Sequence, residues 1–164
     1  MNLTNRRILI VDDNRAIHDD FRKILAPTRL TNSVLSAMEG MLFGDTAPVV
    51  ETDSFEICSA YQGKEAVDLV ADAASCGRPF AMAFVDVRMP PGMDGVETIR
   101  MMWSKSPELQ VVICSAYSDY SWEEIIAKLG KSDRLLILRK PFDTLEVQQL
   151  AANLTEKWSK QNAV

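Results

Sequence analysis

Short apolar runs alternate along the chain with longer segments in which apolar side chains recur every three or four residues. The apolar runs lie at residues 6–11, 55–59, 80–85, 110–115 and 134–138. Continuous apolar runs of this length are typical of strands buried on both faces, whereas the segments between them have the period of amphipathic helices. The alternation indicates βαβ units, so we predict an α/β fold built on a five-stranded parallel sheet.

Start and stop signals bound the first predicted helices. Asn14 is a suitable N-cap for the first helix, and Pro27 ends it. The second helix covers about residues 62–75 and is closed by Gly77, and the third begins near Gly95.

The fourth helix is predicted over about residues 119–129 and is stopped by Gly130, and the last helix begins with Asp143 as a cap. The helical positions that we expect to face the core are Ile17, Phe21, Ile24, Leu25, Ala66, Leu69, Val70, Ala73, Val96, Ile99, Met102, Trp103, Val147, Leu150, Ala151, Leu154 and Trp158.

The segment 27–53 interrupts this rhythm, because connections between a helix and the next strand usually take only a few residues. Its apolar side chains recur at helical spacing, and Gly44 is a suitable stop, so we predict a short amphipathic helix. The helix either folds back over the domain or forms a homodimer or partner surface.

Composition and charge narrow the class of protein. The 164 residues fit one domain, 1–164, and 47% apolar against 25% charged residues allows a single core. The net charge of −5, from 18 basic and 23 acidic side chains, disfavours direct binding of nucleic acid, which needs a clustered basic face. The last helix, 143–164, is placed to lead into an output domain of a longer chain.

The cysteines and the chain start bear on the compartment. Cys58, Cys76 and Cys114 have no metal-ligand spacing, and the first and last of them lie in strand-like runs as small core residues. We find no signal peptide and no apolar span of about 18 residues. We therefore expect a cytoplasmic protein without membrane insertion.

Five polar side chains follow the ends of the apolar runs and define the candidate chemistry. They are Asp12, Asp13, Asp86, Ser115 and Lys140. Because the carboxyl ends of strands in an open parallel sheet line one crevice, we expect these side chains to share a small pocket. Three carboxylates, a hydroxyl and an ammonium suit a divalent cation together with a phosphoryl group.

Each of these side chains has a candidate role. Asp86 is the candidate nucleophile, since a carboxylate can attack phosphorus and form an acyl phosphate. Asp12 and Asp13 would supply oxygens to Mg²⁺. Lys140 would balance the charge of the transferring group, and Ser115 would donate a hydrogen bond to a phosphoryl oxygen. Each residue alone has an ordinary reading as a turn, cap or surface residue, so the hypothesis depends on their conjunction.

His18 and a group of aromatic residues need separate weighing. His18 is the only histidine and follows Ile17, which we expect to face the core, so we place His18 on a solvated helix face and treat catalysis as its minor reading. Tyr117, Tyr120 and Trp122 cluster at the start of the fourth predicted helix. They are either ordinary packing residues or a surface that binds a partner.

Four segments together resemble the receiver domain of two-component response regulators. In chain order they match the family's first strand with its acidic pair, its phosphoacceptor segment, its switch strand and its lysine motif. These segments are 8–15, 85–95, 111–116 and 139–142. The resemblance implies a doubly wound, flavodoxin-like sheet in the order 2-1-3-4-5, with 27–53 as a helical insertion between helix one and strand two.

The resemblance also implies a function and partners. Asp86 would accept a phosphoryl group from a histidine kinase or a phosphotransfer protein, and the domain would catalyse only its own phosphorylation and dephosphorylation. Asp13, Asp86 and the main-chain carbonyl of Arg88 would bind Mg²⁺ directly, with Asp12 acting partly through water. Phosphorylation would draw Ser115 inward and reshape the face of the fourth helix.

The sequence departs from the usual pattern of the receiver family at two places. Ile137 stands where the family often has an aromatic residue, and the loop 89–95 is one residue longer than the commonest form. We also expect a cis peptide bond between Lys140 and Pro141.

The alternative function is a pseudo-receiver, an interaction module that works without phosphorylation, although such domains usually lose the nucleophile or an acid. A haloacid-dehalogenase-type phosphatase needs Asp-x-Asp after its first strand, and a P-loop enzyme needs a glycine-rich loop; the sequence has neither.

Overall fold

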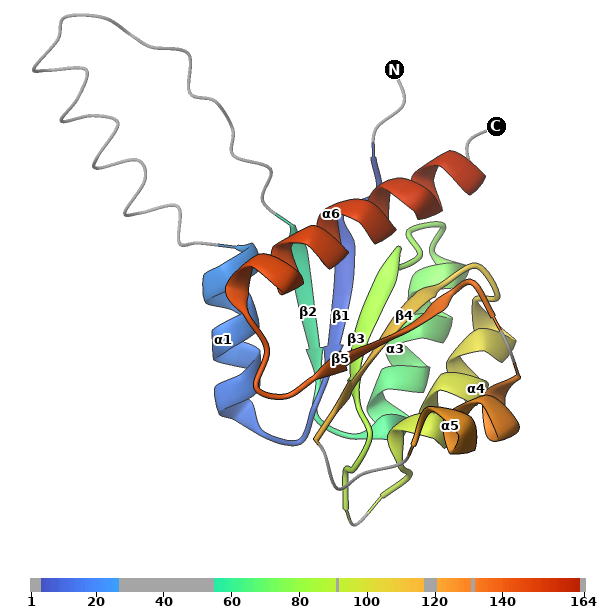
Figure 1. Ribbon diagram of the computed structural model, residues 1–164. Coiled ribbons are helices and arrows are strands. Elements are labelled where there is room, and N and C mark those ends of the chain that lie inside the picture. Colours follow the sequence, from blue (N-terminus) through green and yellow to red (C-terminus); the bar gives the residue numbers. More distant parts are fainter. Residues whose placement is uncertain (1–3, 27–54, 91, 117–120, 131, 163–164) are drawn as a thin grey trace, which may run out of the picture.

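A five-stranded parallel sheet forms the centre of the molecule (Figure 1). The computed structural model describes residues 4–26, 55–90, 92–116, 121–130 and 132–162. The strands are β1 (Arg7–Val11), β2 (Glu56–Ala60), β3 (Met82–Asp86), β4 (Gln110–Ser115) and β5 (Leu135–Arg139). Their order in the sheet is β2-β1-β3-β4-β5, so the predicted fold class and strand order are confirmed.

Helices cover both faces of the sheet (Figure 1). The helices are α1 (Arg15–Leu25), α3 (Gly63–Ser75), α4 (Gly95–Lys105), α5 (Trp122–Leu129) and α6 (Thr144–Gln161). Side chains of α1 and α6 pack on one face, and those of α3, α4 and α5 pack on the other. Among the helices that the structure describes, none is long and apolar enough to cross a membrane.

Side-chain caps set the helix starts. Asn14 accepts a hydrogen bond from the main-chain N–H of Ala16, and Asp143 caps α6 in the same way, as the sequence predicts. α5 begins three residues later than the predicted start at 119, because Ser121 caps it. The loop residues 117–120, with Tyr117 and Tyr120, lie outside the described part of the chain.

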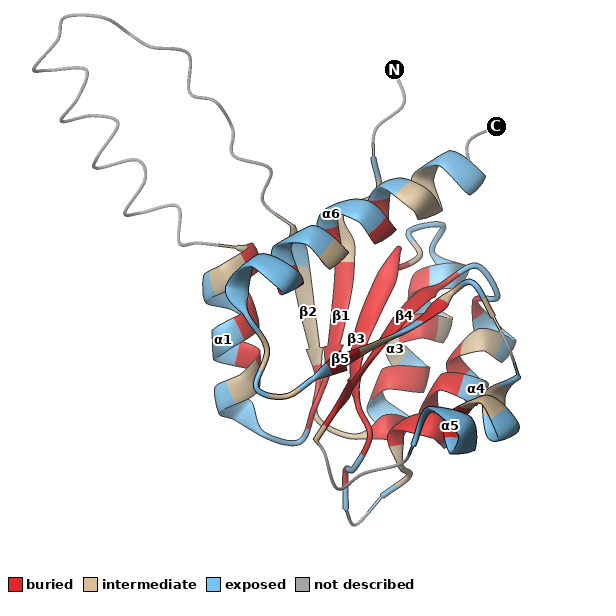
Figure 2. Cartoon of the chain, viewed as in Figure 1, coloured by how far each residue is buried: buried red, intermediate tan, exposed pale blue. Residues whose placement is uncertain are grey.

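The core has two layers, one on each side of the sheet (Figure 2). Along β1, Ile8 and Ile10 face α1 and α6, whereas Leu9 and Val11 face the other three helices. Because both faces are covered, the strands read as continuous apolar runs rather than as an alternating pattern. Cys114 is buried in this core, Cys58 is half-buried and Cys76 is exposed.

The predicted insertion leaves and rejoins the fold at one place. The main-chain N–H of Phe55 donates to the carbonyl of Leu25 (3.2 Å), so the end of α1 and the start of β2 lie side by side. This contact brings together the two flanks of the 27–53 segment. The helix that we predict within the segment lies outside the described residues and stays a prediction.

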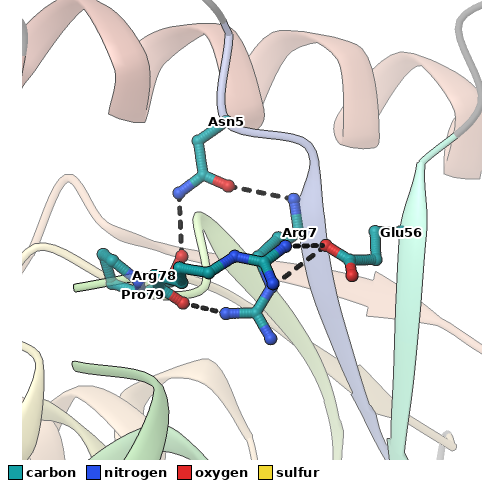
Figure 3. Close-up of polar contacts among 5 residues, drawn as sticks. All are labelled: Asn5, Arg7, Glu56, Arg78 and Pro79. Atoms are coloured by element: carbon teal, nitrogen blue, oxygen red, sulfur yellow. Dashed lines mark hydrogen bonds and ion pairs between the residues drawn. The ribbon is translucent and has the colours of Figure 1, made fainter. Parts of the chain in front are cut away.

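A polar cluster ties the amino end of the sheet together (Figure 3). Glu56 accepts from Arg7 Nε (3.1 Å) and from Arg78 Nη2 (3.3 Å), and Arg7 also donates to the carbonyl of Arg78. The side chain of Asn5 donates to the carbonyl of Pro79 (2.8 Å) and accepts from the main-chain N–H of Arg7 (3.0 Å). We call Asn5, Arg7, Glu56, Arg78 and Pro79 the amino-end cluster.

Candidate functional site

Three carboxylates meet at the opposite, carboxyl end of the sheet. Val11 pairs with Val85 across β1 and β3, so Asp12 and Asp86, the next residue on each side, emerge at the same level. Oxygens of Asp12, Asp13 and Asp86 all lie within 4.8 Å of one another. Asp12 and Asp86 are buried, with 2% and 8% exposure, and Asp13 is exposed. The structure therefore brings together the acidic residues that the sequence grouped.

Lys140 joins this acidic pocket from the end of β5. Its Nζ lies 3.2 Å from Asp12 Oδ2 and 3.2 Å from Asp86 Oδ1. Its main-chain N–H donates to the carbonyl of Ser115 (2.9 Å), which fixes the turn to the end of β4. The Lys140–Pro141 peptide bond is cis, as predicted. The ammonium of Lys140 thus pairs with two of the three carboxylates.

Burial and neighbouring charges shift the pKa values of two groups in the pocket. Burial and the nearby charge of Asp12 raise the pKa of Asp86 above its ordinary value, although Lys140 acts to lower it. Burial acts to lower the pKa of Lys140, but Asp12 and Asp86 outweigh it, so the net shift is upward. A second cation would relieve the remaining repulsion among the carboxylates.

Asp12 is held by hydrogen bonds on all sides. Its main-chain N–H donates to the carbonyl of Ala60 (3.1 Å), and its Oδ1 accepts from the main-chain N–H of Asn14 (2.9 Å). Its own carbonyl accepts from Nε2 of His18 (2.7 Å). A side chain of α1, that of His18, therefore helps to hold the main chain of Asp12 in place.

The prediction that His18 lies on a solvated face is wrong. His18 is 2% exposed, and its Nδ1 lies 3.0 Å from Ser59 Oγ at the end of β2. It shares the buried face of α1 with Phe21 and Leu25, whereas Ile17 is only half-buried. The spacing 18, 21, 25 is itself helical, so this signal was present in the sequence.

Ser115 lies at the end of β4 and Arg88 lies just beyond β3, as expected, and their roles at the site stay predictions. Ser115 is buried at the end of β4, and its hydroxyl donates to the carbonyl of Ala116 (3.0 Å). A hydroxyl has one proton to donate, so a bond to a phosphoryl oxygen requires it to turn from that carbonyl. Arg88 is exposed, two residues beyond Asp86.

Comparison with known proteins identifies the family. The family described as "Response regulator receiver domain" matches residues 41–152. The chain belongs to the response regulator receiver family. The match begins after β1, so the acidic pair Asp12 and Asp13 is placed in this receiver by the sheet rather than by that match.

Relatives and solved structures agree with this assignment. The receiver is 28% identical over 136 residues to the response regulator MprA of Mycolicibacterium vanbaalenii, covering 83% of this chain and 44% of that protein. It superimposes on a CheY-like receiver domain from Methanospirillum hungatei JF-1 with a TM-score of 0.66 at 20% identity, covering 96% and 98% of the two chains. The receiver domain of an HD domain-containing protein from Pseudomonas fluorescens Pf-5 gives a TM-score of 0.67 at 16% identity, covering 100% and 97%. At these identities the structural likeness shows the fold.

The start of α4 packs directly against the main chain of Asp86 in this receiver. The N–H of Gly95 donates to the carbonyl of Val87 (2.7 Å). A Cβ at Gly95 would collide with the carbonyl of Asp86 and would lie 2.9 Å from Cα of Val87. Only glycine allows this close approach, which fixes the end of β3 against the helix.

An apolar surface lies on α5 of the receiver. Trp122 is 41% exposed, and it lines a hollow of about 460 Å³ with Glu123, Ile126 and Ala127. Ile137 is half-buried and packs against the core. The exposure of Trp122 favours the partner-surface reading of this residue over ordinary packing.

Proposed function

We propose that this receiver accepts a phosphoryl group on Asp86 from a histidine kinase or a phosphotransfer protein. The observation that carries the proposal is the buried carboxylate of Asp86, held with Asp12, Asp13 and the ammonium of Lys140 at the carboxyl end of the sheet. Burial and the nearby charge of Asp12 raise the pKa of Asp86 although Lys140 acts to lower it, and carboxylates perturbed in this way are common at functional sites.

The transfer step follows from these positions. One oxygen of Asp86 attacks the phosphorus, and an O–P bond forms while the P–N bond of the donor's phosphohistidine breaks. The electron pair of the broken bond leaves on the imidazole nitrogen. Lys140, which already lies 3.2 Å from Asp86 Oδ1, is placed to balance the charge on the transferring group.

The donor set fits Mg²⁺. Three carboxylates with oxygens within 4.8 Å of one another offer the hard oxygen ligands that this ion prefers. Asp12, Asp13, Asp86 and the main-chain carbonyl of Arg88 would hold it. When bound, the ion would supply positive charge that polarises a phosphoryl oxygen and reduces repulsion between the phosphoryl group and the acids.

Switching would begin at Ser115. A phosphoryl group adds about −1.5 to −2 charges. The Ser115 hydroxyl would turn from the Ala116 carbonyl toward this charge, and the chain between Ser115 and α5 would follow. The side chain of Ile137 has no hydroxyl that could favour an exposed position over a buried one. We therefore expect phosphorylation to change the surface of α5 around Trp122 rather than the surface of β5.

Chemical labelling tests the proposed function. With Mg²⁺ and a small phosphodonor, the wild-type chain should gain one phosphate that is labile to base and hydroxylamine, whereas Asp86→Asn should gain none. Asp94→Asn is the matched control, since asparagine keeps the cap of α4, and it should label normally. Labelling of Asp86→Asn would refute the assignment, and a wild type that takes no label would support the pseudo-receiver.

A further inference from the structure

His18 is a buried polar residue that the proposed chemistry does not use. The residue is 2% exposed, and the centroid of its ring lies 4.5 Å from that of Tyr61. Both ring nitrogens form hydrogen bonds. A side chain enclosed in this way does not touch a group bound in the pocket. Any effect that it has on the site must therefore pass through Asp12, to which it is bonded.

The hydrogen-bond partners place the protons of the ring. A carbonyl oxygen only accepts, so the Nε2 facing Asp12 carries a proton. Nδ1 can then accept from the hydroxyl of Ser59, which in turn accepts from Nη2 of Arg22 (2.6 Å). A chain of hydrogen bonds thus runs from Arg22 through Ser59 and His18 to the main chain of Asp12.

The bonded carbonyl belongs to the peptide unit that joins Asp12 to Asp13. A peptide unit is planar, so fixing its carbonyl also fixes its N–H and the direction in which Asp13 leaves it. β1 ends at Val11, so this carbonyl lies beyond the paired residues of β1. His18 supplies the partner that a neighbouring strand would otherwise provide.

We propose that His18 is a positioning residue for the metal site. Its hydrogen bond holds the peptide between Asp12 and Asp13 so that both carboxylates turn toward one ion. This inference rests on the proposed function, because it requires the pocket to bind Mg²⁺. The plain alternative is a core histidine whose loss lowers stability and nothing else.

Two polar substitutions separate these readings. In His18→Gln the amide reaches about as far as Nε2 and can still donate to the Asp12 carbonyl. In His18→Asn the shorter amide reaches only as far as Nδ1, so it keeps the Ser59 contact and loses Asp12. His18→Leu removes both bonds, and Thr155→Val is the matched control, since it deletes a buried side-chain bond to the carbonyl of Ala151 (2.7 Å) in α6.

Mg²⁺ affinity of the full chain is measured by titration calorimetry, with the metal-free Tm recorded on the same samples. We expect His18→Asn and His18→Leu to bind about 10-fold more weakly, as for other partners that orient a metal ligand. His18→Gln should bind like the wild type, and Thr155→Val should lose stability without losing affinity.

The outcomes distinguish this inference from the proposed function. Equal affinity in the wild type, His18→Asn and His18→Gln overturns the positioning role, whatever happens to Tm. If His18→Leu does not fold, the Asn and Gln pair still decides the question. A wild type that binds no Mg²⁺ overturns both, whereas normal wild-type binding and labelling with no effect of His18 overturns the inference alone.

Discussion

The two ends of the central sheet carry similar charged residues in opposite arrangements. At the amino end, two arginines share one glutamate, and the main-chain carbonyls of Arg78 and Pro79 accept hydrogen bonds from Arg7 and Asn5 (Figure 3). At the carboxyl end, three carboxylates lie together, and Lys140 is paired with two of them, Asp12 and Asp86. The strand β1 contributes to both ends, through Arg7 and through the acidic pair that follows Val11.

The difference shows how one fold separates stability from function. In the amino-end cluster, two arginines share one glutamate, and the excess positive charge is exposed to water at Arg78, so the cluster needs no bound ion to be stable. In the acidic pocket, burial and the nearby charge of Asp12 raise the pKa of Asp86, and such an arrangement favours a cation or a phosphoryl group that completes the site. Functional sites commonly give up stability in this way.

We expect the largest effect from removing Lys140, which should lower the phosphorylation rate much more than the stability. Lys140→Ala should slow phosphorylation of Asp86 about 100-fold, the loss expected when one preorganised charge is removed from a reacting site. With saturating Mg²⁺ present, Tm should fall by less than about 8 °C, or about 2 kcal/mol.

Lys157→Met is the matched control for Lys140. It breaks an ion pair with Asp133 (3.6 Å) and should leave the phosphorylation rate unchanged. A larger fall in Tm for Lys140→Ala, with a normal rate, would make Lys140 a structural residue and remove the contrast between the two ends.

Mg²⁺ affinity should depend on the acidic pocket alone. Asp13→Ala should weaken binding more than Asp12→Ala, because both carboxylate oxygens of Asp12 already accept hydrogen bonds, whereas Asp13 is exposed. We expect a loss of at least about 10-fold for Asp13→Ala, by titration calorimetry. Glu56→Gln, at the amino end, should bind normally. Equal affinity in Asp13→Ala and the wild type would count against this pocket.

The amino-end cluster should affect stability only. Arg7→Met removes the bond to the Arg78 carbonyl, the ion pair with Glu56 and the contact of the guanidinium with the Phe80 ring, 4.5 Å away. We expect a loss of about 2 kcal/mol, hence about 4–8 °C in Tm. Lys160→Met, at an exposed pair with Glu156, should change stability by less than about 1 kcal/mol. A change in Mg²⁺ affinity in Arg7→Met would show that the ends are coupled.

The smallest expected effect is a gain in stability at the pocket. The pKa of Asp86 is higher in the folded chain than its ordinary 3.8, so the stability of the wild type falls as the pH rises from 3.8 through that raised pKa. Asp86→Asn removes this penalty, and without Mg²⁺ its Tm at pH 7 should be about 2–4 °C higher, corresponding to about 1 kcal/mol. The gain should vanish below pH 3.8. A less stable Asp86→Asn at pH 7 would mean that the ion pair with Lys140 outweighs the repulsion.

Sequence reasoning succeeded where a feature depends on local pattern. Strand β4 has the predicted bounds, and the other strands differ by one or two residues, since buried apolar runs are unmistakable but their ends are not. The grouping of Asp12, Asp86 and Lys140 followed from topology, because parallel strands end at one edge.

It failed where tertiary contacts decide between two local readings. Ile17 and His18 both fit a helical stripe with Phe21, and His18 is buried because β2 brings Ser59 against it. The start of α5 was ambiguous, because aspartate at 119 and serine at 121 are both good caps. The direction of the Ser115 hydroxyl is a rotamer choice that no sequence pattern records.

The close packing at Gly95 limits which substitutions this site tolerates. The residue has no functional group, yet a single methyl group there would strike the carbonyl of the proposed phosphoacceptor. Its replacement would disturb the chemistry by displacing backbone, not by deleting an atom that reacts. A survey of single substitutions would therefore find a position as intolerant as Asp86 on the neighbouring helix, and a map of reactive atoms alone would leave it out.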